Sequence, residues 1–180
     1  MKGITTTKRL VGTAMFAALA YITSLFEFPI FPAVPFLKLD FSAVFIALSA
    51  FIFGPICGIT TCFIKEFIAY ITKSSTGGIG EIANFIVISG YILIPSIVYC
   101  YKKGFPTVII TLIMGCVVQV ALALLSNRFI MFPLFFGADA VKWFGSTWAF
   151  ILAFNAIKAV AVSILTILLY KRISGFIKRI

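Results

Sequence analysis

The sequence contains no histidine and only five acidic residues among 180. Without histidine, a His-ligated metal site and a Ser-His or Cys-His catalytic pair are both excluded. A G-x-x-x-x-G-K-[ST] phosphate loop is also missing, so we do not expect the chain to hydrolyse ATP. The four cysteines form no C-x-x-C pair and lie in or beside apolar runs, which favours buried apolar side chains. We therefore expect no metal, no cofactor and no enzymatic activity.

Apolar residues, by contrast, are in excess. They make up 62% of the sequence, and the mean hydropathy is +1.18. A soluble domain averages roughly 45–50% apolar residues and has too little interior to bury such a surplus. The formal net charge of +10 would suggest nucleic acid in a soluble protein, but here the charges are scattered between apolar runs. Lipid is therefore the expected surrounding, and we expect no nucleic-acid partner.

The apolar runs predict an all-α integral membrane bundle of six transmembrane helices in a single domain, 1–180. A helix needs about 20 apolar residues to cross the hydrocarbon layer. The predicted spans are Leu10–Phe26, Leu39–Phe53, Ile56–Thr72, Ile79–Tyr99, Phe105–Leu125 and Thr147–Tyr170, with a long loop from Asn127 to Ser146. The second span is short, which leaves open a tilted helix, a thinned bilayer or a helix packed inside the bundle.

The loop charges predict the orientation of the bundle. One alternating set of termini and loops holds no acid and nine basic residues: Lys2, Lys8, Arg9, Lys102, Lys103, Lys171, Arg172, Lys178 and Arg179. The opposite set holds four basic and four acidic residues: Lys38, Lys73, Arg128, Lys142, Glu27, Asp40, Glu81 and Asp139. The positive-inside rule then predicts a multi-pass cell-membrane protein with both termini in the cytoplasm.

Polar residues inside the spans indicate a site, because each is costly in lipid. Lys158 lies near the centre of the sixth span, and Asn155 shares its helix face. Their donors and acceptor would match the edge of a planar heterocycle, or else form a structural pair between helices. Asp40, Asn84 and Asn127 lie at a similar depth. The agreement in depth predicts a polar pocket open to the outside.

Lys65 and Glu66 are adjacent in the third span. Neighbouring residues on a helix do not face each other, so a mutual salt bridge is not expected, whereas a bridge to another helix is plausible. In the first span, Ala14-x-x-x-Ala18, with Gly12 and Ala17 nearby, gives a small-residue surface. That surface would either dock another protein or pack within the chain.

These residues resemble the substrate-binding S component of an energy-coupling factor (ECF) vitamin transporter of the riboflavin type. The resemblance covers nearly the whole chain and depends on the order and spacing of its motifs: PFLKLDFS at Pro35–Ser42, Phe53-Gly54-Pro55 with Gly58, Lys65, GEIANF at Gly80–Phe85, Asn127 with Pro133, FNAIK at Phe154–Lys158, and Tyr170-Lys171-Arg172.

The resemblance implies capture of riboflavin from outside the cell for an ATP-driven transporter. It implies docking, through Ala14 and Ala18, onto an energy-coupling transmembrane subunit that is driven by two cytoplasmic ATPase subunits. Asn127, Asn155 and Lys158 would hold the flavin ring. Asp40, Lys65 and Asn84 would hold the ribityl chain. Riboflavin would be the transported ligand rather than a cofactor.

Three alternatives remain open. Another vitamin, such as pantothenate or folate, could bind the same scaffold. A membrane-embedded lipid enzyme would need clustered carboxylates or histidines at one membrane face, and the five acids form no such motif. A channel would need a polar stripe through the full depth of a span, whereas polarity here is graded toward the outside.

Overall fold

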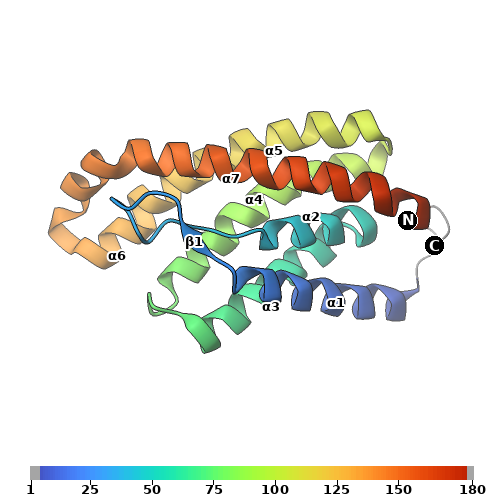
Figure 1. Cartoon of the computed structure of the whole chain (residues 1–180), viewed down its shortest axis with the longest axis horizontal. Coiled ribbons are helices and arrows are strands. Elements are labelled where there is room, and N and C mark those ends of the chain that lie inside the picture. The colour runs from blue at the N-terminus through green and yellow to red at the C-terminus, as the bar shows by residue number, and fades with distance from the viewer. Residues whose placement is uncertain (1–4, 178–180) are drawn as a thin grey trace.

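The computed structural model describes residues 5–177, which fold almost entirely into helices (Figure 1). A two-residue antiparallel pair, β1 (Phe28–Pro29) with β2 (Lys38–Leu39), lies in the connection between the first two helices. In chain order the helical elements are α1 (Thr6–Ser24), α2 (Ser42–Phe53), α3 (Pro55–Lys73), α4 (Ile79–Tyr101), α5 (Phe105–Ser126), a π-helical turn (Asn127–Met131), α6 (Phe132–Phe136), a 3₁₀ turn (Gly137–Asp139) and α7 (Ala140–Ile177).

The helices are consistent with a membrane bundle. By length and composition, three described helical stretches could cross a membrane: Pro55–Lys73, Ile79–Tyr101 and the continuous stretch Phe105–Arg172, which contains α5 and most of α7. The first turn of α1 carries Lys8 and Arg9, which lower its average hydropathy. Large apolar side chains lie exposed along these helices, as expected where lipid is the solvent.

The count of six complete spans is not confirmed. Within residues 5–177, five helices have 19 residues or more, and α2 has only 12. Twelve residues rise about 18 Å, which is less than the ~30 Å hydrocarbon layer. Of the three possibilities left open for α2, packing inside the bundle is confirmed, because every α2 residue except Phe45 is buried. Helices α1, α3, α4 and α7 all contact it.

The predicted loop from Asn127 to Ser146 is wrong. The chain stays helical through this segment, by way of the π-helical turn, α6 and the 3₁₀ turn, and α7 begins at Ala140. The reversal of direction occurs at Gly137, whose φ of 51° favours glycine. The segment is rich in aromatic residues: the ring of Phe132 packs in a tilted arrangement on Phe136 and edge-to-face against Phe144 of α7. Apolar packing against α7 therefore keeps it helical.

Close helix contacts use small residues. A Cβ at Gly12 of α1 would collide with the ring of Phe53, and one at Gly58 of α3 would collide with Ala50. Between α2 and α3, Gly54 has a φ of 104°, and Pro55 opens the next helix. These positions let α1 and α3 approach the buried α2.

The start of α1 and the end of α7 lie at the same end of the bundle (Figure 1). The end of α4 joins them there, since the hydroxyls of Tyr99 and Tyr170 are hydrogen-bonded at 2.5 Å. Six of the nine residues in the predicted basic set therefore lie at this end of the bundle: Lys8, Arg9, Lys102, Lys103, Lys171 and Arg172. The other members, Lys2, Lys178 and Arg179, lie outside the described residues.

Candidate functional site

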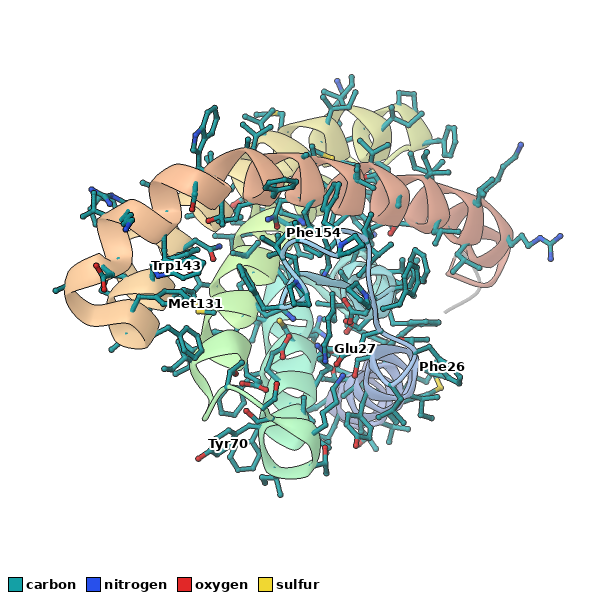
Figure 2. The ribbon with its side chains drawn as sticks, turned by 60° about the vertical axis from the view of Figure 1, so that its left-hand side comes forward. Phe26, Glu27, Tyr70, Met131, Trp143 and Phe154 are labelled. Carbon is teal, nitrogen blue, oxygen red and sulfur yellow. The ribbon has the colours of Figure 1, made fainter. Side chains whose placement is uncertain are left out.

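One cavity, of about 200 Å³, brings together all six residues that the sequence predicts for substrate binding. Asp40 precedes α2, Lys65 belongs to α3, Asn84 to α4, Asn127 to the π-helical turn, and Asn155 and Lys158 to α7. Glu27, Met131 and Phe154, labelled in Figure 2, line the same cavity from the α1–β1 connection, the π-helical turn and α7. The cavity thus lies where the α1–α2 connection, α3, α4, α5, the π-helical turn and α7 converge.

Asp40 is the centre of a buried ionic network. One of its carboxylate oxygens accepts a hydrogen bond from Lys158 at 2.7 Å, and the other lies 3.8 Å from the ammonium of Lys65. The hydroxyl of Ser42, in the first turn of α2, donates to that second oxygen. Each of the three ionic side chains is at most 5% exposed. The start of α2 is thereby tied to both α3 and α7.

The network continues to Glu66, and here one prediction is wrong. Lys65 and Glu66 form a direct salt bridge of 2.9 Å, although adjacent helix positions point about 100° apart. Both are buried without bulk water, so the flexible lysine stem bends toward the adjacent carboxylate. Glu66 is joined to another helix by a hydrogen bond rather than by a salt bridge, because the amide of Asn84 in α4 donates to Glu66 at 2.8 Å.

Charge in this cavity is balanced. The inner network pairs Asp40 and Glu66 with Lys65 and Lys158. Removing an unpaired charge from water costs several kcal/mol, and pairing offsets that cost. The network therefore holds four ionisable groups at membrane depth without a net charge.

The asparagines present acceptors to the cavity. The side-chain amide nitrogen of Asn127 donates to the carbonyl of Ala123, and that of Asn155 donates to Ile151. Each bond returns four residues along the same helical segment and fixes the amide against it. Within the described part of the chain, neither side-chain oxygen accepts a hydrogen bond. These oxygens are therefore available to a donor in the cavity.

At the rim, Glu27 joins two lysines. Its carboxylate lies 3.0 Å from Lys38 and 2.7 Å from Lys73, and Lys73 also donates to the backbone carbonyl of Ser24. Burial raises the pKa of Glu27, but the hydrogen bonds from Lys73 and Lys38 outweigh it, so this pKa lies below its usual 4.5. The cluster holds the α1–α2 connection against the end of α3.

Gln119 is a lining residue that the sequence predictions missed. It is the only glutamine in the sequence, lies on α5 and is 2% exposed. No hydrogen bond of its side chain occurs within the described residues. A signal was available, because Gln119 stands inside the apolar run of the fifth span, where a polar amide is costly.

The small residues of α1 divide between two faces. Ala14 and Ala18 are exposed, as a docking surface requires. Gly12 and Ala17 are buried inside the bundle, so the predicted contribution of these two to the same surface is wrong. Helix geometry explains the division: at about 100° per residue, Ala14 and Ala18 lie about 40° apart, Gly12 lies on the opposite side of the helix from Ala14, and Ala17 is turned about 60° from Ala14 in the direction away from Ala18.

Comparison with known proteins agrees with this architecture. The model of the family "ECF transporter, substrate-specific component" matches residues 8–170. This chain is a member of that family. It is 32% identical to the riboflavin transporter RibU of Staphylococcus aureus, over 96% of this chain and 94% of the relative. It is 28% identical to the riboflavin transporter FmnP of Bacillus subtilis, over 96% of this chain and 95% of the relative.

A solved structure of the S component of a bacterial ECF transporter has the same fold as this S component. The TM-score is 0.84 at 32% identity, and the match covers 97% of this chain and 99% of that chain. The family consists of substrate-binding transporter components rather than enzymes. Membership together with the apolar helices makes the chain a multi-pass cell-membrane protein.

Proposed function

We propose that this S component captures riboflavin from outside the cell and delivers it to an ATP-driven ECF transporter. The observation that carries the proposal is the charge-balanced cavity, in which fixed amides and lysines face apolar walls such as Phe36 and Phe154. A flavin is flat and amphipathic, and such a ligand suits an apolar pocket with a few well-placed polar groups. The names of the two relatives support riboflavin as the ligand.

Asn127, Asn155 and Lys158 would hold the ring. The flavin edge offers carbonyl acceptors and an imide N–H donor. The free side-chain oxygens of the two asparagines can accept from the imide. The ammonium of Lys158 has three N–H donors and gives one to Asp40, which leaves two for ring carbonyls.

Asp40, Lys65 and Asn84 would hold the ribityl chain. Hydroxyl groups both donate and accept, so a carboxylate, an ammonium and an amide can each bind one. The cavity of about 200 Å³ is below the roughly 300–1,000 Å³ of ligand sites in general. We therefore expect side chains of the connection between α1 and α2 to move outward as the vitamin enters.

Charge favours riboflavin over the alternative vitamins. Pantothenate and folate carry carboxylates, whereas riboflavin is uncharged. Each of the four lysines that line the cavity already lies 2.7–3.0 Å from an acid oxygen of the same lining. An added carboxylate would find no cation without breaking one of these pairs.

The proposal includes topology and partners. Helices α1 to α5 and α7 would form six membrane segments with both termini in the cytoplasm, because the basic end of the bundle carries no acid. The exposed Ala14 and Ala18 would dock onto the energy-coupling transmembrane subunit, and two cytoplasmic ATPase subunits would supply energy. The chain itself would need no cofactor.

The direct test is a riboflavin titration of the purified protein. We expect flavin fluorescence to be quenched on binding and pantothenate and folate not to compete. Absence of quenching, or displacement by either acidic vitamin, would contradict the assignment.

A further inference from the structure

A second cavity lies on the side of the bundle, between the start of α2 and the last turns of α7. It measures about 810 Å³ and shares no lining residue with the substrate cavity. Its walls are apolar, with Phe41, Val44 and Phe45 on one side and Leu165, Leu168 and Leu169 on the other. We refer to this cavity as the α2–α7 groove.

The groove ends at two cations. Lys171 and Arg172 complete its lining, and both are exposed. Arg172 lies three residues after Leu169 and four after Leu168, so it shares their helix face and lies about one turn beyond them. None of the five acidic residues of the sequence lines the groove. Among the described residues, the charged lining of the groove therefore consists of Lys171 and Arg172.

This polar end lies at the basic end of the bundle. Tyr170, beside the two cations, is hydrogen-bonded to Tyr99 near the end of α4. The groove is apolar along its length and has cations at its end. A phospholipid has the same two parts, an apolar acyl chain and a charged headgroup. Basic pockets between membrane helices bind anionic headgroups, and the arginine fork pairs with phosphate oxygens.

We propose that the α2–α7 groove binds one anionic phospholipid of the phosphatidylglycerol class. Its acyl chain packs between Phe45 and Leu168, and its phosphate lies at Lys171 and Arg172. A zwitterionic lipid is disfavoured, because its headgroup cation would lie beside two protein cations, and no acidic side chain is among the described lining residues of the groove. The site is independent of the proposed vitamin, since the two cavities share no residue.

Native mass spectrometry tests the proposal on the full chain extracted from nanodiscs that contain equal parts of palmitoyl-oleoyl phosphatidylglycerol and phosphatidylcholine. We expect one phosphatidylglycerol to be retained in preference to phosphatidylcholine. The double variant Lys171→Gln/Arg172→Gln should weaken this retention about thirtyfold, the loss expected for two cations near an anionic headgroup.

The matched control is Lys102→Gln/Lys103→Gln. It removes the same charge from an exposed pair at the same end of the bundle, outside the groove, and should leave retention unchanged. A second variant, Leu168→Trp, fills the groove from an exposed position without altering charge and should also release the lipid. Unchanged circular dichroism would show that each variant is folded.

Three results would overturn the proposal. Equal retention of the two lipids would indicate ordinary annular lipid. Equal losses in the two double variants would indicate attraction to the basic end as a whole. Full retention in Leu168→Trp would show that the lipid lies outside the groove, even if Lys171 and Arg172 attract it.

Discussion

The ammonium of Lys158 lies 2.7 Å from a carboxylate oxygen of Asp40, although the two residues are 118 positions apart in the sequence. Both side chains are buried. The bond joins the centre of α7 to Asp40, two residues before α2, and Lys65 of α3 approaches the same carboxylate. Lys158, which we propose as a binding residue, is therefore also one partner of a buried ion pair, and substitutions at this position must be interpreted with both roles in mind.

Replacing Lys158 with methionine should weaken riboflavin binding about 10- to 150-fold. The variant keeps the apolar stem but loses the charged donors, and such hydrogen bonds are worth about 1.5–3 kcal/mol. Asp40 keeps Lys65 nearby, so we expect the protein to stay folded. Titration by fluorescence quenching measures the effect. Lys142→Met, at an exposed site on the same helix, is the control. Equal affinity in the two variants would show that Lys158 does not contact the ligand.

Gln119→Leu should reduce riboflavin affinity about 2- to 12-fold, which corresponds to one neutral hydrogen bond of about 0.5–1.5 kcal/mol. Because the amide has no partner in the described chain, its loss should not lower the melting temperature of the ligand-free protein. The substitution should therefore lower the riboflavin affinity while leaving the melting temperature unchanged. A lower melting temperature with unchanged affinity would mean that Gln119 supports the fold instead.

Ala14→Trp should leave riboflavin binding intact and abolish uptake by the assembled transporter. The large ring would block close approach of a partner helix at a surface that small residues keep open. Ala121→Trp is the matched control, since Ala121 is equally an exposed alanine but lies on α5. Uptake of radiolabelled vitamin by cells is the measurement. Normal uptake with Ala14→Trp, or equal loss in both variants, would refute the docking surface.

Glu27 should make the stability of the fold depend on pH. Its pKa is lower in the folded protein than the usual 4.5, so its ion pairs stabilise fully above that value and are lost as the pH falls toward the lowered pKa. Glu27→Gln should therefore flatten the decline in melting temperature below pH 4.5. Asp139→Asn removes an exposed acid outside this cluster as the control. Parallel curves for wild type and Glu27→Gln would contradict the role of this cluster.

The orientation can be measured by cysteine labelling in a chain whose four native cysteines are replaced. Lys142→Cys should react with a membrane-impermeant maleimide on intact cells, and Lys102→Cys should react only after permeabilisation. Both lysines are exposed; Lys102 follows the end of α4, and Lys142 lies in the first turn of α7. The reverse pattern would place the termini outside.

Much of the architecture follows from the sequence. Hydropathy is a local property, so the apolar runs predict most helix positions to within a few residues. The cost of a charge in lipid likewise singles out Lys158 and Lys65 without any knowledge of their neighbours. Asn127 and Asn155 emerge from the same rule, and all line the cavity.

Only the tertiary structure decided which of these groups meet. No local pattern joins Asp40 to Lys158, and the bridge between Lys65 and Glu66 contradicts what helix geometry alone suggests. The sequence also did not predict the helical segment after Asn127. This segment is stabilised by aromatic packing against α7 rather than by residues with high helix propensity. The sequence shows which polar groups are costly to bury in an apolar helix. Which partner offsets that cost depends on packing between helices that are distant along the chain.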